Sequence, residues 1–411
     1  MIDSCLYKRI IFHIDVNSAF LSWEASRRVA RGEKDIRDIP SCVGGNPKSR
    51  TGIVVAKSIP AKKYGIETGE PVSSALRKCP NLLIVPADFD FYMQCSRGFK
   101  NICNMYTPAM ESFSIDEVFM DMSGMKNIYP DIEKTAYEIK DKIKNELGFT
   151  VNVGIGENKL CAKMASDFEK PDKVHTLMMN EIPLKMWPLP INDLFTCGKA
   201  SAEKLCSIGL KTIGDVAHSS EMSLIKILGE SQGRHLYRFA SGIDNSPVLA
   251  HKEEAKGYSI ETTVEDDLTD IDEICKMLLA QADIVCARMR SENAKCRCVA
   301  VSYRTTDFKN KTHQKKLEET TDVTDFVYEV AKKLIVEVWK REPLRLIGLA
   351  LSDVVRDDYE QISFIIDEKA EKLKKLDSAL DSIRGRYGSD SIHRAGVTDI
   401  EGKISRGRRK Q

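Results

Sequence analysis

Three carboxylates in two apolar, strand-like segments are the residues of this sequence that could do chemistry together. Asp116 and Glu117 lie within residues 113–121, whose other members are mostly apolar, and Asp15 lies near the end of a second apolar segment at 9–17. A carboxylate in such surroundings is either neutral or paired with a cation, and Mg²⁺ prefers oxygen ligands of this kind. If the two segments are neighbouring strands, the three carboxylates could balance two divalent ions, which suits phosphoryl transfer.

The acidic pair also has simpler interpretations. Asp116 and Glu117 could form the solvated tip of a hairpin, and only the second acidic segment favours a shared site instead. The Asp-x-Asn pattern at Asp15 resembles the start of an EF-hand calcium loop. That loop requires Gly at its sixth position and Glu at its twelfth, where this sequence has Phe20 and Ser26, so we exclude it.

The composition is that of an ordinary multidomain protein. The chain has 411 residues, of which 42% are hydrophobic and 30% charged, with a formal net charge of +1, and this length favours roughly two to four domains. No apolar segment approaches the length of a membrane span and no secretory leader is evident, so we expect a cytoplasmic protein without a membrane partner. The twelve cysteines form no CxxC pair, which argues against a zinc site or a disulfide framework.

Hydrophobic periodicity predicts an α+β fold for the first part of the chain. The expected elements are a strand at 9–17, helices at 18–30, 89–106 and 132–147, the acidic hairpin, and a strand at 150–156. Without the first helix, this order folds as a ferredoxin-like βαββαβ sheet with its helices on one face. Residues 19–87 would be an insertion, with a short strand at 52–57 and a helical turn at 58–65.

Gly154 and Gly156 suggest a dinucleotide-binding turn, but Lys159 replaces the third glycine of that fingerprint, so we exclude a Rossmann site. A helix at 160–166 is expected directly after this turn. A lysine beside the N-terminal amides of a helix suits a phosphate group, which makes Lys159 a candidate ligand.

Residues 180–244 are predicted to form short helices. Within them, residues 197–205 and 208–215 resemble a helix-hairpin-helix element, whose hairpin would present backbone amides to a nucleic-acid phosphate. An ordinary turn between two helices with a glycine cap explains the same spacing. The sequence leaves both interpretations open.

After a predicted linker at 245–255, the pattern of the first domain is repeated. The expected elements are strands at 258–264, 296–305, 313–318 and 344–354, with helices at 271–291 and 323–340. The middle of this second βαββαβ segment is rich in basic residues: Arg288, Arg290, Lys295, Arg297, Arg304, Lys309, Lys311, Lys315 and Lys316. Such an excess is typical of a phosphate-binding surface, although a solvated hairpin would have the same composition.

These segments together resemble the Y family of translesion DNA polymerases, in its DNA polymerase IV branch, over residues 8–366. Residues 13–17, 114–121 and 153–163 are similar to the family's three palm motifs. The resemblance implies a palm at 1–18 and 88–178, fingers at 19–87, a helix-hairpin-helix thumb at 179–244, the linker at 245–255, a DNA-binding little finger at 256–360, and a clamp-binding motif with a basic tail at 361–411.

The resemblance also implies roles for single residues. Asp15, Asp116 and Glu117 would hold two Mg²⁺ ions with the Val16 carbonyl, and Phe20 would be the steric gate that rejects a 2′-hydroxyl. Lys62 and Lys159 would bind the triphosphate. Gly198, Lys199, Arg297, Arg304 and Lys315 would bind DNA, and Gln361, Phe364 and Ile365 would dock into a sliding clamp. The implied substrates are primer-template DNA and deoxynucleoside triphosphates, and we expect a monomer.

Three positions depart from the family pattern, with Asn17 in place of Asp, Ile59 in place of Tyr and Lys62 in place of Arg. Ile59 lacks the hydroxyl of Tyr, and Lys62 offers one ammonium group where Arg would offer a bidentate guanidinium. Nucleotide affinity should therefore be affected more than catalysis. The leading hypothesis is template-directed DNA synthesis past damaged bases by two-metal nucleotidyl transfer. A catalytically silent family member that recruits partners to the clamp should have lost a metal carboxylate, and a nucleotide cyclase would lack the second half of the chain.

Overall fold

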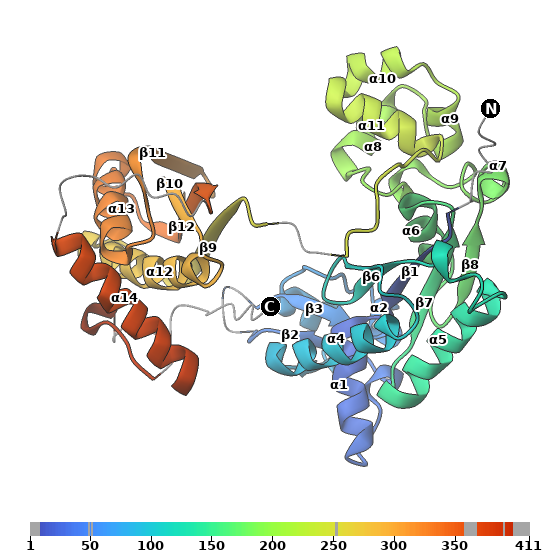
Figure 1. Ribbon diagram of the computed structural model, residues 1–411, viewed down its shortest axis with the longest axis horizontal. Helices are drawn as coiled ribbons and strands as arrows, with labels where there is room; N and C mark the ends of the chain where they lie inside the picture. Colours follow the sequence, from blue (N-terminus) through green and yellow to red (C-terminus); the bar gives the residue numbers. More distant parts are fainter. Residues whose placement is uncertain are drawn as a thin grey trace. The chain divides into compact units, whose positions relative to one another are not determined.

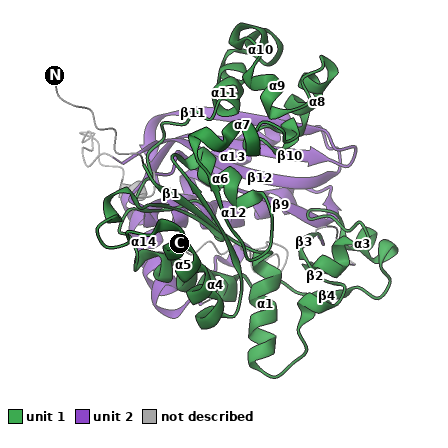
Figure 2. Cartoon of the chain, turned by 90° about the vertical axis from the view of Figure 1, so that its right-hand side faces the viewer, with its two compact units in different colours: residues 1–46, 53–252 green, residues 47–52, 253–411 purple. Residues whose placement is uncertain are grey.

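The computed structural model describes residues 9–47, 50, 52–250, 254–356, 368–388 and 391–397. The chain forms two compact units, one made of residues 1–46 and 53–252 and the other of 47–52 and 253–411 (Figure 2). Among the described residues, no helix is long and apolar enough to cross a membrane.

The first unit is built on a five-stranded sheet with strand order β5-β6-β1-β7-β8 (Figure 1). The strands are β1 (Ile11–Val16), β5 (Met110–Ser112), β6 (Glu117–Asp121), β7 (Val151–Gly156) and β8 (Val174–Leu177). Strand β1 lies between β6 and β7 and is antiparallel to both, as the predicted ferredoxin-like topology requires. Strand β8, which the sequence did not predict, pairs in parallel with β7.

The two faces of this sheet are covered by different helices. Helices α4 (Phe89–Asn104) and α5 (Ile132–Leu147) share a core with Phe12 and Ile14 of β1, so the two predicted helices lie on one face. Helix α6 (Lys159–Asp167) packs against β7 and β1. A Cβ atom on Gly154 would come within 2.0 Å of the Ala162 carbonyl oxygen, so only glycine allows this close approach. The glycines that resemble a dinucleotide fingerprint therefore serve helix packing.

The insertion after β1 begins with helix α1 (Ala19–Ala30) and contains a small sheet of order β3-β2-β4. Its other elements are β2 (Ser41–Gly44), β3 (Val54–Lys57), α2 (Ile59–Lys62), α3 (Val72–Lys78) and β4 (Leu83–Val85). The sequence predicted α1, β3 and the α2 turn but not β2, α3 or β4. Strands of three or four residues are too short for a clear periodic pattern.

Five helices complete the first unit: α7 (Ile182–Lys185), α8 (Lys199–Ser207), α9 (Ile213–Ala217), α10 (Glu221–Leu228) and α11 (Glu230–Ala240). After α11 the chain returns to the sheet. The amide of Leu249 donates to Glu111 of β5 over 2.8 Å, and Arg9 donates to the Ser246 carbonyl over 3.2 Å. The first residues of the predicted linker are thus held against the sheet of their own unit.

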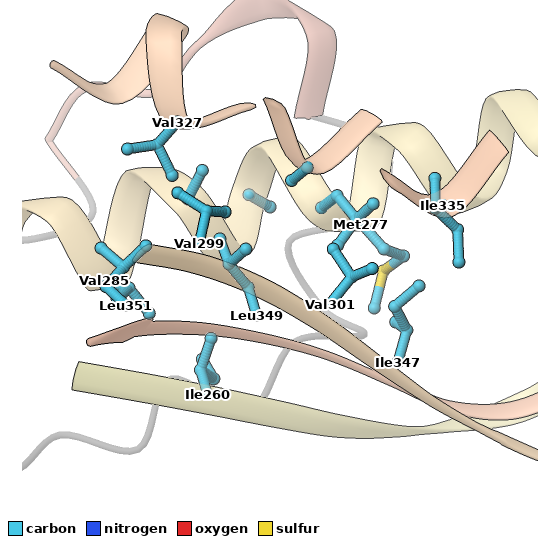
Figure 3. Close-up of a cluster of buried hydrophobic side chains, with 14 of the residues drawn as sticks. Ile260, Met277, Val285, Val299, Val301, Val327, Ile335, Ile347, Leu349 and Leu351 are labelled. Atoms are coloured by element: carbon cyan, nitrogen blue, oxygen red, sulfur yellow. The ribbon is translucent and has the colours of Figure 1, made fainter. Parts of the chain in front are cut away.

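The second unit repeats the βαββαβ order with strand order β11-β10-β12-β9. Its elements are β9 (Gly257–Leu268), α12 (Ile271–Ser291), β10 (Lys295–Thr305), β11 (Asn310–Thr321), α13 (Thr324–Val338) and β12 (Leu344–Val355). Alternate strand residues such as Ile260, Val301 and Leu349 point toward Met277 of α12 and Ile335 of α13, and together they form the core (Figure 3).

A C-terminal helix, α14 (Glu368–Tyr387), is joined to this unit by buried ion pairs. Asp377 has a side-chain exposure of 1% and accepts from Arg394 over 2.7 Å and from the Thr324 amide over 2.9 Å. Arg290 approaches the same carboxylate at 3.4 Å and pairs with Asp381 at 2.7 Å. The sequence indicates a helix at 373–387 without a role, and the structure makes it part of the fold of the second unit.

Candidate active site

The sheet register brings Asp15 and Glu117 together. Asp15 is directly opposite Glu117 on β6 and Asn152 on β7, so the three side chains lie on the face covered by α6. The next pair in the register, Ile14 and Val118, points into the core on the opposite face. Asp116 precedes β6, and its carbonyl accepts from the Val16 amide over 3.0 Å. Two apolar strands therefore place the carboxylates Asp15 and Glu117 at the same end of the sheet, as the sequence suggested.

Two lysines that the sequence analysis did not single out contact these carboxylates. Lys163 of α6 is largely buried and pairs with Glu117 at 2.7 Å, and Lys170, in the turn after α6, pairs with Asp15. Burial raises the pKa of Asp15 to about 6, although the Lys170 charge acts in the opposite direction. Spacing is a signal for Lys163 alone, since it follows the phosphate candidate Lys159 by one helical turn.

His13 lies beneath the acidic pair, fully buried. Its Nδ1 is 2.7 Å from the Ser166 hydroxyl, its ring packs on Phe119 at 4.6 Å between centroids, and its Nε2 lies 3.9 Å from Glu117. Burial, with Lys163 nearby, holds the pKa of His13 well below its usual value, so the ring is neutral at pH 7.

Asp116 is held differently from the other two carboxylates. Its side chain accepts from the Ser114 hydroxyl over 2.6 Å, while the Lys100 ammonium donates to the Ser114 carbonyl over 2.7 Å. Within the part of the chain that the structure describes, no three His, Cys, Asp or Glu side chains are grouped so as to hold a metal ion. The donor chemistry nevertheless fits Mg²⁺, because the available groups are all oxygens, and the ammonium groups of Lys163 and Lys170 stand where a cation would bind two of the carboxylates.

Phe20 lies on α1, one turn after the end of β1. Its half-buried ring packs in a cluster with Trp23, Phe89 and Tyr92, at centroid distances of 5.7, 5.8 and 5.1 Å. An aromatic ring held on three sides cannot move aside easily, and this is what a steric gate requires.

The predicted triphosphate ligands occupy different environments. Lys62 is exposed at the end of α2, and the neighbouring Ile59 is also exposed, at 59%. Lys159 is instead paired with both oxygens of Glu111, at 2.7 and 2.8 Å, and its ammonium lies 4.8 Å from the Phe119 ring centroid. The lysines in direct contact with predicted metal carboxylates are instead Lys163 and Lys170.

The predicted helix-hairpin-helix forms from α8, a turn at Gly209 and α9, with Gly198 as the N-cap of α8. The hairpin amides have acceptors within the element. Those of Gly209 and Leu210 donate to carbonyls of α8, and those of Lys211 and Thr212 donate to Asp215 at 2.9 and 2.8 Å. These four amides are therefore satisfied within the element itself.

The basic residues predicted to bind DNA lie on two sides of the second sheet. Arg304 follows the core residue Tyr303 and points to the face away from the helices, where it bonds Asn310 over 2.7 Å. Lys315 is directly opposite the core residue Val299, so it points to the helix side of the edge strand β11. Arg297 is exposed and donates to the Glu318 carbonyl over 3.1 Å. The predicted clamp-binding residues Gln361, Phe364 and Ile365 lie outside the described residues.

Comparison with solved structures defines the class of fold. A Y-family DNA polymerase chimera superposes with a TM-score of 0.72 over 85% of this chain and 100% of that chain, at 22% identity. The impB/mucB/samB family matches residues 14–167, its C-terminal domain matches 255–364, and a DNA polymerase-iota thumb domain matches 192–244. The fold is that of a Y-family DNA polymerase, with the predicted α+β architecture.

Sequence relatives define the group within that class. A DNA polymerase IV of Clostridium acetobutylicum is 45% identical over 96% of this chain and 100% of its own length. DNA polymerase IV of Clostridium kluyveri is 36% identical over 94% and 98%, and DNA polymerase IV 1 of Bacillus subtilis is 33% identical over 97% and 95%. The chain belongs to the DNA polymerase IV family. This confirms the predicted class of enzyme, and no finding supports the catalytically silent alternative.

Proposed function

We propose that this chain extends a primer 3′ end on a DNA template, past damaged bases. The reaction would take place at the end of the first sheet where Asp15 and Glu117 lie opposite each other. The observation that supports the proposal is their direct pairing in the β1–β6 register, with the Asp116 carbonyl bonded to the Val16 amide. The palm, fingers, thumb and little finger of the resemblance, with their predicted boundaries, are part of the same proposal.

Asp15, Asp116, Glu117 and the Val16 carbonyl would hold two Mg²⁺ ions. When bound, such ions neutralise charge on the attacking oxygen and on the leaving pyrophosphate. Lys163 and Lys170 keep the anionic site compact in the folded chain, because each ammonium pairs with one of its carboxylates. Fixed carboxylates on two neighbouring strands orient the reacting groups without reorganisation of the backbone.

The nucleotide would lie between α1 and the basic groups of the insertion. Phe20 would contact the sugar at C2′, supported by the aromatic cluster around it. Lys62 and Lys159 are the sequence-based candidates for the triphosphate, and we add Lys170, because it already neutralises an anionic oxygen of the same site. Gly198, Lys199, Arg297 and Arg304 are the proposed DNA contacts. We do not retain the predicted Lys315, because it points to the helix side of β11.

Primer extension on an undamaged template tests the proposal. Purified chain with Mg²⁺ and the four deoxynucleotides should lengthen a labelled primer, and chelation of the metal should stop extension. A template with one abasic site then separates translesion synthesis from ordinary synthesis. Absence of any extension on the undamaged template, with primer-template binding intact, would contradict the proposal.

We also propose that residues 361–365 bind a sliding clamp and that the chain acts as a cytoplasmic monomer. Phe364 and Ile365 would be anchors in an apolar groove, so changing both to Ala should weaken clamp binding by at least about tenfold. Surface-immobilised clamp provides the binding measurement. The alternative, in which both side chains pack within the chain, predicts a lower melting temperature and unchanged clamp binding.

A further inference from the structure

Asn17, the residue that departs from the family's usual Asp, takes part in a buried hydrogen-bond network beside the carboxylates. Asn17 is 7% exposed and Asn152, on the neighbouring strand, is fully buried. The Asn17 Nδ2 donates to Asn152 Oδ1 over 3.1 Å, and the Asn17 Oδ1 accepts from the Asp172 amide over 3.0 Å. Asn17 therefore joins β7 to the turn that follows α6.

Asn152 extends the network to the rest of that turn. Its Nδ2 donates to the carbonyls of Ser166 and Glu169 over 3.0 and 2.6 Å, and its Oδ1 also accepts from the Lys173 amide over 3.3 Å. Four backbone groups of residues 166–173 are thus satisfied by two side-chain amides. Lys170, whose ammonium contacts Asp15, lies inside this segment.

The backbone groups fix the orientation of both amides. The Asp172 amide can only donate, so the oxygen of Asn17 must face it and the NH₂ group must face Asn152. Asn152 then presents its oxygen to Asn17 and its NH₂ group to two carbonyls. An Asp at position 17 would set a carboxylate oxygen against Asn152 Oδ1, and flipping Asn152 would set that oxygen against the carbonyls instead. Either arrangement leaves two buried acceptors facing each other.

We propose that Asn17 is a positioning residue whose carboxamide, through Asn152 and the Asp172 amide, holds residues 169–173 so that the Lys170 ammonium stays beside Asp15. The inference deepens the proposed function, on which it rests. It also explains why this chain has Asn rather than Asp at position 17, since the Asn152 oxygen requires a hydrogen-bond donor there.

A double-mutant cycle tests the proposal through enzyme kinetics. Asn17→Asp should raise the KM for the incoming nucleotide by about tenfold with a smaller change in kcat, because the ammonium is displaced while the carboxylates remain. In a Lys170→Ala background the same substitution should change KM by less than about twofold, since the two residues act on one interaction. Asn101→Asp, an exposed change of the same type on α4, is the control for added charge. A full Asn17 effect in the Lys170→Ala background would overturn the proposal.

Hydrogen exchange provides a readout that does not depend on activity. The amides of Asp172 and Lys173 should exchange at least about tenfold faster in Asn17→Asp than in the unaltered chain, while the Ile14 amide in β1 stays protected. Asn17→Ala, which adds no buried charge, should give the same result if the Asp variant fails to fold. Unchanged exchange at both amides would refute the positioning role even in an active enzyme. If Lys170→Ala leaves KM unchanged, the proposed role of Lys170 fails, while the exchange rates still decide whether Asn17 holds the turn.

Discussion

The two βαββαβ sheets of this chain have the same order of elements but different strand orders. In the first sheet, the first strand β1 lies in the middle, between β6 and β7. In the second sheet, the first strand β9 lies at the edge, paired only with β12 among the described strands. Order along the chain therefore does not determine which strand is central, and the difference has to come from the side chains.

The burial pattern of each first strand supplies that difference. All six residues of β1, including Asp15, are buried, whereas β9 alternates between buried and exposed residues over most of its length. A strand that is apolar on both sides is stable only where both faces of the sheet are covered, and an alternating strand suits a sheet with one open face. This contrast is legible in the sequence, as the segments IFHIDV and YSIETTV.

The consequence is a different use of the second face. In the first sheet that face carries α6, packed closely on Gly154, and buries the carboxylates with their lysines. In the second sheet the corresponding face carries polar and charged groups, such as Arg304 and the Ser302 hydroxyl bonded to Glu261 over 3.0 Å. The first face is therefore largely closed to solvent, and the second is the face that we propose for DNA recognition.

The largest expected effect concerns the buried face of the first sheet. Glu117→Ala should lower kcat for primer extension by more than about a thousandfold, because the lost group acts on charge in the transition state. Primer-template affinity should change little. Asp121→Ala, at the far end of the same strand, is the matched control. Activity within tenfold of the unaltered enzyme would remove Glu117 from the catalytic site.

In the second unit, the corresponding buried charges are structural. Asp377→Ala removes the most buried of the carboxylates that face Arg394 and Arg290, so the free energy of unfolding of this unit should fall by about 3 kcal/mol. Thermal unfolding monitored in the second unit measures the change. Asp381→Ala, at 28% side-chain exposure, should cost clearly less. Equal effects of the two substitutions would show that burial of Asp377 does not matter.

Phe20 tests whether rigid packing next to β1 sets sugar selectivity. Phe20→Ala should raise the relative efficiency of ribonucleotide incorporation by about a hundredfold, because space opens under C2′ and no buried group has to move. Phe91→Ala removes a ring of α4 that packs on Tyr92 and Arg27, and it is the control. An unchanged ratio of ribo- to deoxynucleotide efficiency would place the gate at another residue.

The sequence predicted the two βαββαβ sheets, the acidic pair of strands and most long helices because these have strong periodic patterns. Helix α5 and helix α12 have the predicted bounds, 132–147 and 271–291. The sequence did not reveal the lysines at positions 163 and 170, because a basic residue on a helix or turn is usually solvated and only tertiary packing directs it to a carboxylate. The internal bonding of the hairpin amides depends on Asp215 and was also not evident.

The smallest expected effect separates the two sides of the second sheet. Arg304 points to the face away from α12 and α13, and Lys315, on the adjacent strand, points to the helix side. If the open face binds DNA, Arg304→Ala should weaken affinity only several-fold but reduce the slope of log affinity against log salt by about 0.9, the value for one phosphate.

Lys315→Ala is the matched variant, since it removes the same charge from the same hairpin on the other side. It should leave the salt dependence nearly unchanged, because a lysine on the helix side is directed away from a duplex on the open face. Fluorescence anisotropy with labelled primer-template across a salt series measures both variants. A larger slope change for Lys315 than for Arg304 would mean that DNA follows the edge strand β11 rather than the open face. The open face of the second sheet would then not be the DNA-binding face.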